Sequence, residues 1–292
     1  MIRLGTRGSA LALAQARLVA DLLDDEVELV AIKTSGDKRS GDGDKSRFVK
    51  EIEDALIAGR VDVAVHSAKD VPSELPPGLA IVGVPERADA RDALCGASSL
   101  EQLPDGAAVG TSSLRRRAQL LALRPDLDLQ ELRGNVDTRL RRLAQGDFTA
   151  LVLAQAGLNR LGRGGEGVPL PELVPAPGQG CLALEARAGD ERTAAAAARV
   201  TDRAALICLT AERALVAALG ATCRTPIGAH AQPVEGALRL TAFAGMPDGS
   251  HWIRDVHEGD PDEPAQVGRE VAERMAAAGA SDLLDAAERA AA

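Results

Sequence analysis

The sequence predicts an α/β protein of three domains, with two α/β lobes around a cleft and a small α+β domain at the C-terminal end. Its 292 residues are enough for two or three separate cores, and 46% of them are hydrophobic. Short apolar segments alternate with helical patterns, which is typical of βαβ units with mostly parallel sheets. This pattern occurs twice before a long amphipathic segment begins near residue 203.

The first predicted lobe begins at the N-terminus. Ser9 precedes an apolar helical pattern, and its hydroxyl is suited to cap that helix by accepting a hydrogen bond from a backbone amide. A polar segment at 35–47 is longer than most connections, and we expect it to be a flexible lid. The elements predicted here are strands at 1–5, 27–34, 61–67 and 79–85 and helices at 9–23 and 48–59.

The second predicted lobe starts near residues 86–92. Pro and Gly cluster at 162–180, as expected for a chain that crosses back, and the strand predicted at 181–187 would then return to the first lobe. The elements predicted in between are strands at 107–113, 127–134 and 148–158 and helices at 113–124 and 135–146.

The third predicted domain has a different character. A helix at 203–219 comes first, and the turn "PDGS" joins two alternating runs into a hairpin at 237–259. Two helices, at 263–278 and 281–291, finish the chain. We therefore expect domain 1 to contain residues 1–87 and 181–201, domain 2 residues 88–180, and domain 3 residues 202–292.

The composition argues against several classes of protein. Aromatic residues make up 1% of the chain, so stacking platforms for nucleic acid are not expected, and the net charge of −9 argues against nucleic-acid and anionic-membrane partners. No apolar run has the length of a membrane span, and the N-terminus is predicted to form a strand, a turn and a helix rather than a signal peptide. We expect a cytoplasmic protein and a monomer. The cysteines lack zinc-type spacing, so no metal is expected.

Arginine dominates the basic residues, since only five of the 34 Lys and Arg residues are Lys. Either genome composition or a need for guanidinium groups that bind carboxylates in bidentate fashion explains this bias. Arg115, Arg116 and Arg117 follow Ser112 and Ser113 at the predicted start of a helix, where three cations oppose the helix dipole. This placement indicates either a bound anion or a solvated basic face.

Further arginines lie at predicted junctions of strands and helices. With the three at the helix start, they predict a cleft for a ligand with many carboxylates or phosphates. The chain has no G-x-x-x-x-G-K-[ST] loop, which disfavours phosphate. These further arginines are Arg7, Arg133, Arg139 and Arg160.

Two more segments carry candidate chemistry. His66, Lys69 and Asp70 follow a buried-type strand, and they form either an ordinary turn or a carboxylate beside a lysine in a cleft. In "GATCRTPIGAH", Cys223 lies on a predicted turn, where it is either packed or functional, and Arg224 would favour its thiolate. The remaining cysteines, at positions 95, 181 and 208, are expected to pack as small core residues.

Several of these segments resemble one known family, hydroxymethylbilane synthase, also called porphobilinogen deaminase. The similarity runs in order from residue 2 to about 250, and its longest motifs are specific. The segments are "TRGSALALAQA", "FVKEIE", "VHSAKDVP", "GTSSLRRRAQ", "LRGNVDTRL", "LAQAGLNRL", "PGQG" and "CRTPIGAHA".

The resemblance implies an enzyme that joins four porphobilinogens head to tail, with loss of ammonia, and then releases the linear tetrapyrrole by hydrolysis. It implies two lobes similar to bacterial solute-binding proteins, a dipyrromethane cofactor bound through a thioether to Cys223, and Asp70 as the catalytic carboxylate. Lys45, Phe48 and Gln179 match positions near the cleft. A non-enzymatic polyanion-binding protein is the alternative. The residues that the resemblance assigns to cofactor and substrate carboxylates are Arg7, Ser9, Lys69, Thr111, Ser113, Arg115, Arg116, Arg133, Arg139 and Arg160.

Overall fold

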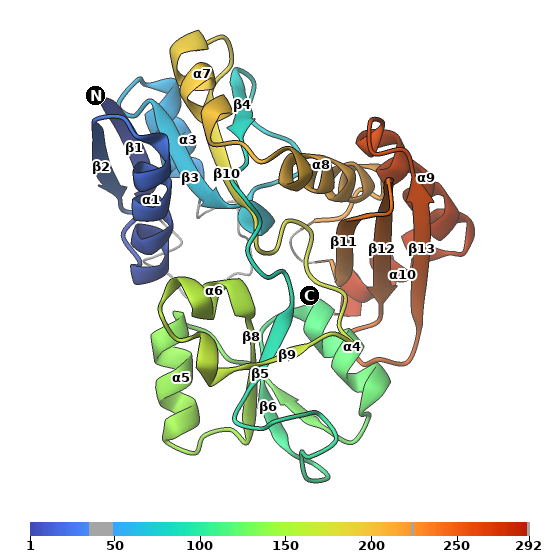
Figure 1. Cartoon of the computed structure of the whole chain (residues 1–292). Helices are drawn as coiled ribbons and strands as arrows, with labels where there is room; N and C mark the ends of the chain where they lie inside the picture. The colour runs from blue at the N-terminus through green and yellow to red at the C-terminus, as the bar shows by residue number, and fades with distance from the viewer. Residues whose placement is uncertain (35–48, 223–224, 291–292) are drawn as a thin grey trace.

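The computed structural model describes residues 1–34, 49–222 and 225–290, which form three β-sheets with helices packed around them (Figure 1). The first two sheets belong to the two α/β lobes, and the third forms the C-terminal domain. The predicted segment 35–47, together with Lys45, Phe48 and Cys223, lies outside the described residues. An α/β protein with two lobes and a small α+β domain was predicted, and this prediction is confirmed.

The first lobe has a five-stranded sheet in the order β2-β1-β3-β10-β4. Strand β1 runs parallel to β2 and β3, whereas β10 is antiparallel to β3 and β4. The prediction of mostly parallel sheets is therefore wrong, because β10 starts beside the end of β3, where Leu182 pairs with Ser67, and runs back along it. The elements are β1 (Ile2–Arg7), α1 (Ala10–Leu23), β2 (Val27–Ile32), α3 (Lys50–Ile57), β3 (Val63–Ser67), the 3₁₀ helix η2 (Ala68–Asp70), β4 (Leu79–Gly83), β10 (Leu182–Arg187) and α7 (Glu191–Arg199).

The second lobe has a mixed sheet in the order β7-β6-β8-β5-β9, in which β5 is antiparallel to its neighbours. The strand predicted at 148–158 is wrong in its second half, because the chain turns into helix α6 after Ala154. A continuous apolar run does not distinguish these two states. The elements are β5 (Asp92–Cys95), β6 (Ala108–Gly110), α4 (Leu114–Leu123), β7 (Asp128–Gln130), α5 (Val136–Ala144), β8 (Ala150–Ala154), α6 (Gln155–Arg160), the 3₁₀ helix η3 (Gly164–Glu166) and β9 (Val168–Leu170).

The C-terminal domain is a three-stranded antiparallel sheet whose inner face packs against helices. The predicted hairpin is confirmed as β12 and β13, and the predicted helices near 203–219, 263–278 and 281–291 are confirmed as well. The strand β11 was not predicted. The elements are α8 (Arg203–Ala218), β11 (Ile227–Val234), β12 (Ala237–Gly245), β13 (Trp252–Gly259), α9 (Pro264–Ala277) and α10 (Ala280–Ala290).

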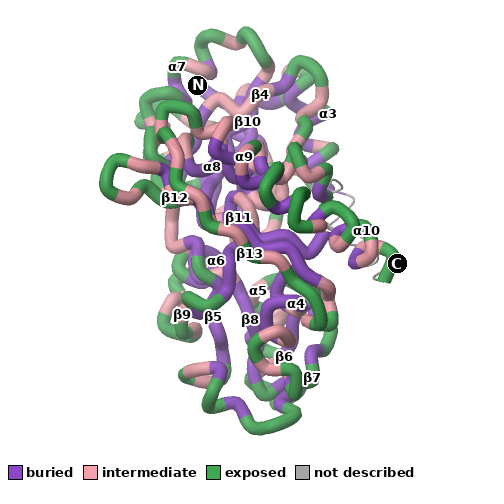
Figure 2. The backbone as a smooth tube through the Cα atoms, turned by 90° about the vertical axis from the view of Figure 1, so that its right-hand side faces the viewer, coloured by how far each residue is buried: buried purple, intermediate pink, exposed green. Residues whose placement is uncertain are grey.

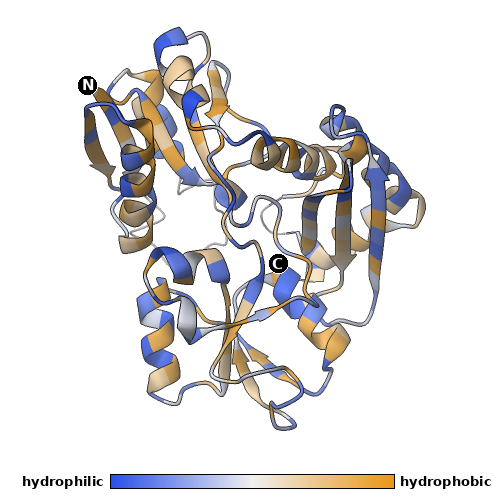
Figure 3. Cartoon of the chain, in the orientation of Figure 1, coloured by the Kyte–Doolittle hydropathy of each residue, from blue (hydrophilic) through white to orange (hydrophobic). Residues whose placement is uncertain are grey.

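The cores consist mainly of Leu, Val, Ile and Ala, as the scarcity of aromatic residues predicts. Figure 2 shows buried backbone running through both lobes, and Figure 3 shows that hydrophobic residues dominate the central strands. Cys95, Cys181 and Cys208 are buried, which confirms their predicted packing role. None of the helices in the described residues combines the length and the hydrophobicity that crossing a bilayer requires.

A buried carboxylate on α8 joins the C-terminal domain to the crossover between the lobes. Glu212 is fully buried and accepts hydrogen bonds from Arg87 at 2.6 Å, from the Gly178 amide at 2.6 Å and from the Ala231 amide at 2.8 Å. Burial alone would raise the pKa of Glu212, but the charge of Arg87, its hydrogen bonds and the nearby His230 together outweigh burial and lower that pKa. The crossover is thus held by an ionised group.

Candidate functional site

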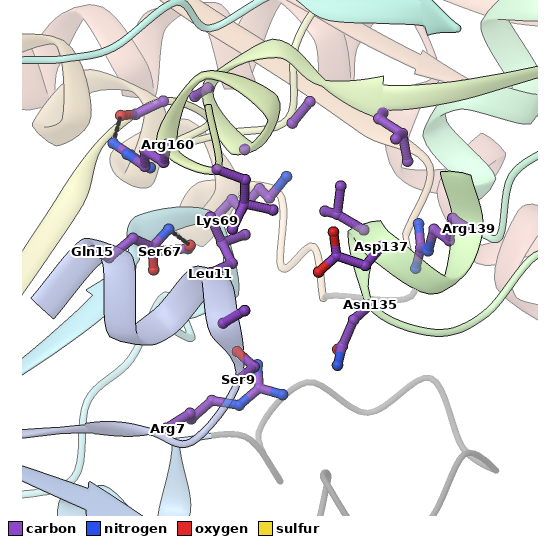
Figure 4. A pocket seen from close by; sticks show the side chains of 18 of the residues that line it. Arg7, Ser9, Leu11, Gln15, Ser67, Lys69, Asn135, Asp137, Arg139 and Arg160 are labelled. Carbon is purple, nitrogen blue, oxygen red and sulfur yellow. Dashed lines mark hydrogen bonds between the residues drawn. The ribbon is translucent and has the colours of Figure 1, made fainter. Parts of the chain in front are cut away.

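A cavity of about 210 Å³ lies between the two α/β lobes, and residues of both lobes line it (Figure 4). Among the described residues that line it, only Asp137 is acidic, so the cavity is strongly basic within a chain of net charge −9. Such a cavity attracts anionic ligands. Its basic residues are Arg7, Lys69, Arg116, Arg139 and Arg160.

Strand ends of the first lobe supply one wall of the cavity. Arg7 is the last residue of β1, and Lys69 lies in η2 directly after β3, so the two parallel strands bring these cations to the same edge of the sheet. Ser9 lines the cavity and caps α1, since its hydroxyl accepts a hydrogen bond from the Ala12 amide at 3.3 Å. The predicted helix cap is confirmed.

Arg139 and Arg160 supply cations from the second lobe. Arg139 donates to the carbonyl of Gly134 at 2.8 Å and Arg160 to the carbonyl of Gly180 at 2.7 Å, and neither has a carboxylate partner among the described residues. Burial and the neighbouring charge of Arg116 lower the pKa of Arg139 to about 10, and burial lowers the pKa of Arg160. A half-buried cation without a counter-ion is costly, and a bound carboxylate would offset that cost.

Arg115 and Arg116 have a protein partner instead. Both are buried at the start of α4, and the carboxylate of Asp92 accepts from Arg115 at 2.6 Å and from Arg116 at 2.9 Å. Burial alone would raise the pKa of Asp92, but the charges of the two arginines outweigh it and hold that pKa well below its usual range. Arg115 and Arg116 therefore do not form a solvated basic face, and the anion that they bind is the carboxylate of Asp92.

Three more of the predicted residues are not among those that line the cavity. Thr111 is buried, and its hydroxyl accepts from the Ser113 amide at 3.2 Å. Ser113, one of the two serines before this helix, caps α4, because its hydroxyl accepts from the Arg116 amide at 3.4 Å. Arg133 is exposed, and its guanidinium bonds Glu131 at 2.7 Å.

Asp70 and Gln179 lie next to Lys69. Asp70 is half-buried and ends η2, so it follows Lys69 directly but is not among the residues that line the cavity. Gln179 is buried and accepts a hydrogen bond from the Lys69 ammonium at 3.1 Å. His66 is also buried and lies 3.0 Å from Glu185, away from the cavity lining.

Some residues of the site were not predicted. Asp92 is fully buried. The sequence indicates this only by placing an acidic residue at the start of the apolar segment "DALC", since a buried acid needs a partner. Gln15, Ser67, Asn135 and Asp137 line the cavity and carried no comparable signal. The described residues contain no group of three or more His, Cys, Asp or Glu side chains arranged to hold a metal ion.

The described residues on both sides of Cys223 are bonded to the C-terminal domain. The Thr222 amide donates to the hydroxyl of Thr225 at 2.7 Å, and that hydroxyl bonds Glu288 on α10 at 2.6 Å. Ala221 and Ile227, which flank these threonines, are buried in the core of the C-terminal domain. Residues 221–222 and 225–227 are thus part of that domain.

Comparison with known proteins decides the family. Residues 2–195 match the family described as "Porphobilinogen deaminase, dipyromethane cofactor binding domain", and residues 206–277 match "Porphobilinogen deaminase, C-terminal domain". The chain belongs to the porphobilinogen deaminase family. The predicted family, the predicted type of enzyme, a transferase of tetrapyrrole biosynthesis, and the predicted dipyrromethane cofactor are thereby confirmed.

Relatives in the porphobilinogen deaminase family match almost the whole chain. The porphobilinogen deaminase of Deinococcus radiodurans is 46% identical over 98% of each chain. The porphobilinogen deaminase of Thermus thermophilus is 45% identical and covers 97% of this chain and 98% of its own. Among solved structures, a substrate-binding domain of a putative amino acid ABC transporter from Streptococcus pneumoniae is 14% identical, covering 68% of this chain and 91% of its own with a TM-score of 0.40.

Proposed function

We propose that the cavity between the lobes is where this chain joins four porphobilinogens head to tail on a dipyrromethane primer attached to Cys223. The product is then released by hydrolysis as a linear tetrapyrrole. The observation that carries this proposal is the pair Arg139 and Arg160, two cations that have no carboxylate partner among the described residues. Both cofactor and substrate bear carboxylates, which guanidinium groups bind in bidentate fashion.

The residues present fit the dipyrromethane group. Arg7, Lys69, Arg139 and Arg160 offer cations from both lobes, so one ligand with several carboxylates would contact both walls of the cavity. When bound, the group supplies the primer to which the first porphobilinogen is joined. Holding the carboxylates of both partners turns a bimolecular condensation into a reaction between two oriented groups.

Asp70 is proposed to handle charge and protons at the reacting pyrrole. Loss of ammonia from porphobilinogen leaves a cation, and an ionised carboxylate stabilises that charge where it develops. The same carboxylate can take up the proton that the new carbon–carbon bond displaces. Only stabilisation that is stronger in the transition state than in the ground state accelerates the step.

The Asp70→Asn variant tests this role. It keeps the size of the side chain and removes its charge, so we expect porphobilinogen to bind with nearly unchanged KM while kcat falls by roughly 10²–10⁴-fold. The control is Glu74→Gln, which removes an exposed carboxylate four residues later and should leave kcat unchanged. Near-normal turnover by Asp70→Asn would refute the proposed role.

The proposal also covers the domain limits, the localisation, the oligomeric state and the partners of the protein. Domain 1 comprises residues 1–87 and 181–201, domain 2 residues 88–180, and domain 3 residues 202–292. The protein acts in the cytoplasm as a monomer, without a nucleic-acid or membrane partner, and the net charge of −9 supports the absence of polyanionic partners. A polyanion-binding protein without enzymatic activity is not favoured, because family membership supports an enzyme.

A further inference from the structure

Gln179 connects the two α/β lobes through both ends of its side-chain amide. Its Nε2 donates to Oδ1 of Asp92 at 3.0 Å and to the carbonyl of Ala90 at 2.8 Å, and its Oε1 accepts from Nζ of Lys69 at 3.1 Å. Two acceptors lie on one side of the amide and a cation lies on the other, so only one orientation satisfies all three bonds. The amide oxygen of Gln179 must therefore face Lys69.

The glycines on either side of Gln179 allow it to enter this position. A Cβ on Gly178 would lie 3.0 Å from the backbone of Ala68 and Lys69, and a Cβ on Gly180 would lie 2.4 Å from the carbonyl of Ala88. Both glycines have positive φ, 73° and 90°, which other residues rarely adopt. The motif "GQG" thus inserts one glutamine between the backbones of two lobes.

Asp92, which accepts from the Gln179 amide, is held in place by two arginines. Asp92 is fully buried at the start of β5, where Arg115 and Arg116 bind its carboxylate. The ionised carboxylate is a strong acceptor for the Gln179 amide. The near end, Lys69, lies in the cavity wall directly before Asp70.

We propose that Asp92 and Gln179 are positioning residues that form a hydrogen-bond relay, Asp92–Gln179–Lys69, and hold the Lys69 ammonium in place at the cavity. Neither Asp92 nor Gln179 lines the cavity, so both act through Lys69 rather than on the substrate. This inference rests on the proposed function, since the position of Lys69 matters only if the cavity holds carboxylates. It deepens that function by explaining how one cation is aligned across two lobes.

A double-mutant cycle tests the relay. Gln179→Met keeps the length of the side chain and removes its amide, and we expect kcat/KM for porphobilinogen to fall about tenfold, as for one hydrogen bond to a charged group. In a Lys69→Met background the same substitution should change kcat/KM less than about twofold, because the ammonium group that Gln179 positions is already absent. An equal loss in both backgrounds would overturn the proposal.

Gln119→Met is the matched control for lost packing and hydrogen bonds. Gln119 is also a buried glutamine: it donates to the Val174 carbonyl at 3.0 Å and accepts from the Val174 amide at 2.7 Å. It also donates to the backbone carbonyl of Arg115 at 3.5 Å, but it has no hydrogen bond to Asp92, Gln179 or Lys69 among the described residues. We expect this variant to lose stability much as Gln179→Met does, while kcat/KM per folded molecule stays unchanged. A tenfold loss in this control would assign the effect to general destabilisation and contradict the relay.

Gln179→Glu tests the relay if the methionine variant does not fold. When protonated, the new carboxyl donates to Asp92 and accepts from Lys69, as the amide does. When ionised, it faces the carboxylate of Asp92 and competes with substrate for Lys69. Other charged groups also lie near it: Arg87 donates to the Gln179 carbonyl at 3.0 Å, Arg160 donates to the Gly180 carbonyl, Glu212 accepts from the Gly178 amide, and two arginines bind Asp92. We expect activity per folded molecule, relative to the parent, to fall as pH rises. A ratio that does not change with pH would contradict the relay.

Different results would contradict the proposed function and the relay. If the parent protein releases no ammonia and no tetrapyrrole from porphobilinogen, the proposed function is wrong. If the parent is active and Gln179→Met matches its kcat/KM, only the relay is wrong.

Discussion

Replacing Asp92 by Asn should destabilise the protein far more than a typical loss of one charge. The carboxylate is fully buried and accepts hydrogen bonds from Arg115, Arg116 and Gln179 at 2.6–3.1 Å. Asn leaves two buried guanidinium groups without a counter-ion and directs an N–H toward their N–H donors. Removing one partner of a buried ion pair costs about 3–5 kcal/mol, so we expect the free energy of unfolding to fall by about 4 kcal/mol.

Urea and thermal unfolding of Asp92→Asn measure this loss. In a chain of this size, about 4 kcal/mol corresponds to a fall in Tm of roughly 7 °C. The control is Asp89→Asn, three residues earlier, where a partly exposed carboxylate binds Arg91 at 2.6 Å and the expected loss is below about 1 kcal/mol. Equal, small losses in both variants would refute the buried-pair argument.

The same pair gives a pH dependence with a defined sign. The pKa of Asp92 is lowered in the folded protein, so its stabilisation is fully present above the ordinary Asp pKa of about 3.9. It is lost only as pH falls through the lower pKa of the folded state. The stability difference between the parent and Asp92→Asn should therefore stay constant above about pH 5 and shrink in stronger acid. A difference that grows on acidification would contradict this assignment.

Two further substitutions test the cavity and the crossover. Arg139→Met should raise KM for porphobilinogen or slow elongation by about tenfold, which corresponds to the loss of one hydrogen bond between charged groups. The control is Arg141→Met, which removes an exposed arginine of the same helix and should leave both quantities unchanged in steady-state kinetics. Gly178→Ala should lose about 1–3 kcal/mol more stability than Gly162→Ala in urea unfolding. The two glycines have φ of 73° and 70°, but only Gly178 is crowded, so equal losses would contradict the close approach to Ala68 and Lys69.

Local features of the fold could be predicted from the sequence. Ser9 and Ser113 cap their helices because a cap depends only on the residues of the first turn. The strand ends that carry Arg7 and Lys69 follow from the apolar segments before them. The return of β10 to the first lobe was predicted as well, but its antiparallel direction was not, since that depends on where the crossover enters the sheet.

Long-range partners could not be predicted. Asp92 binds arginines 23 and 24 residues away, on a different element, and no local pattern records such a pairing. The same holds for Gln179, which meets Lys69 across 110 residues. The arginines at the start of α4 looked like an anion site because their protein anion was not visible in the local sequence. The roles of Asp70 and Cys223 come from the family resemblance and remain predictions.

Intact-mass measurement of the purified protein tests the central claim most directly. We expect the parent to be heavier than the bare 30.2 kDa chain by one covalently bound dipyrromethane. The Cys223→Ser variant should fold, carry no adduct and form no tetrapyrrole. A parent preparation that has the bare mass and nevertheless makes tetrapyrrole would contradict the account.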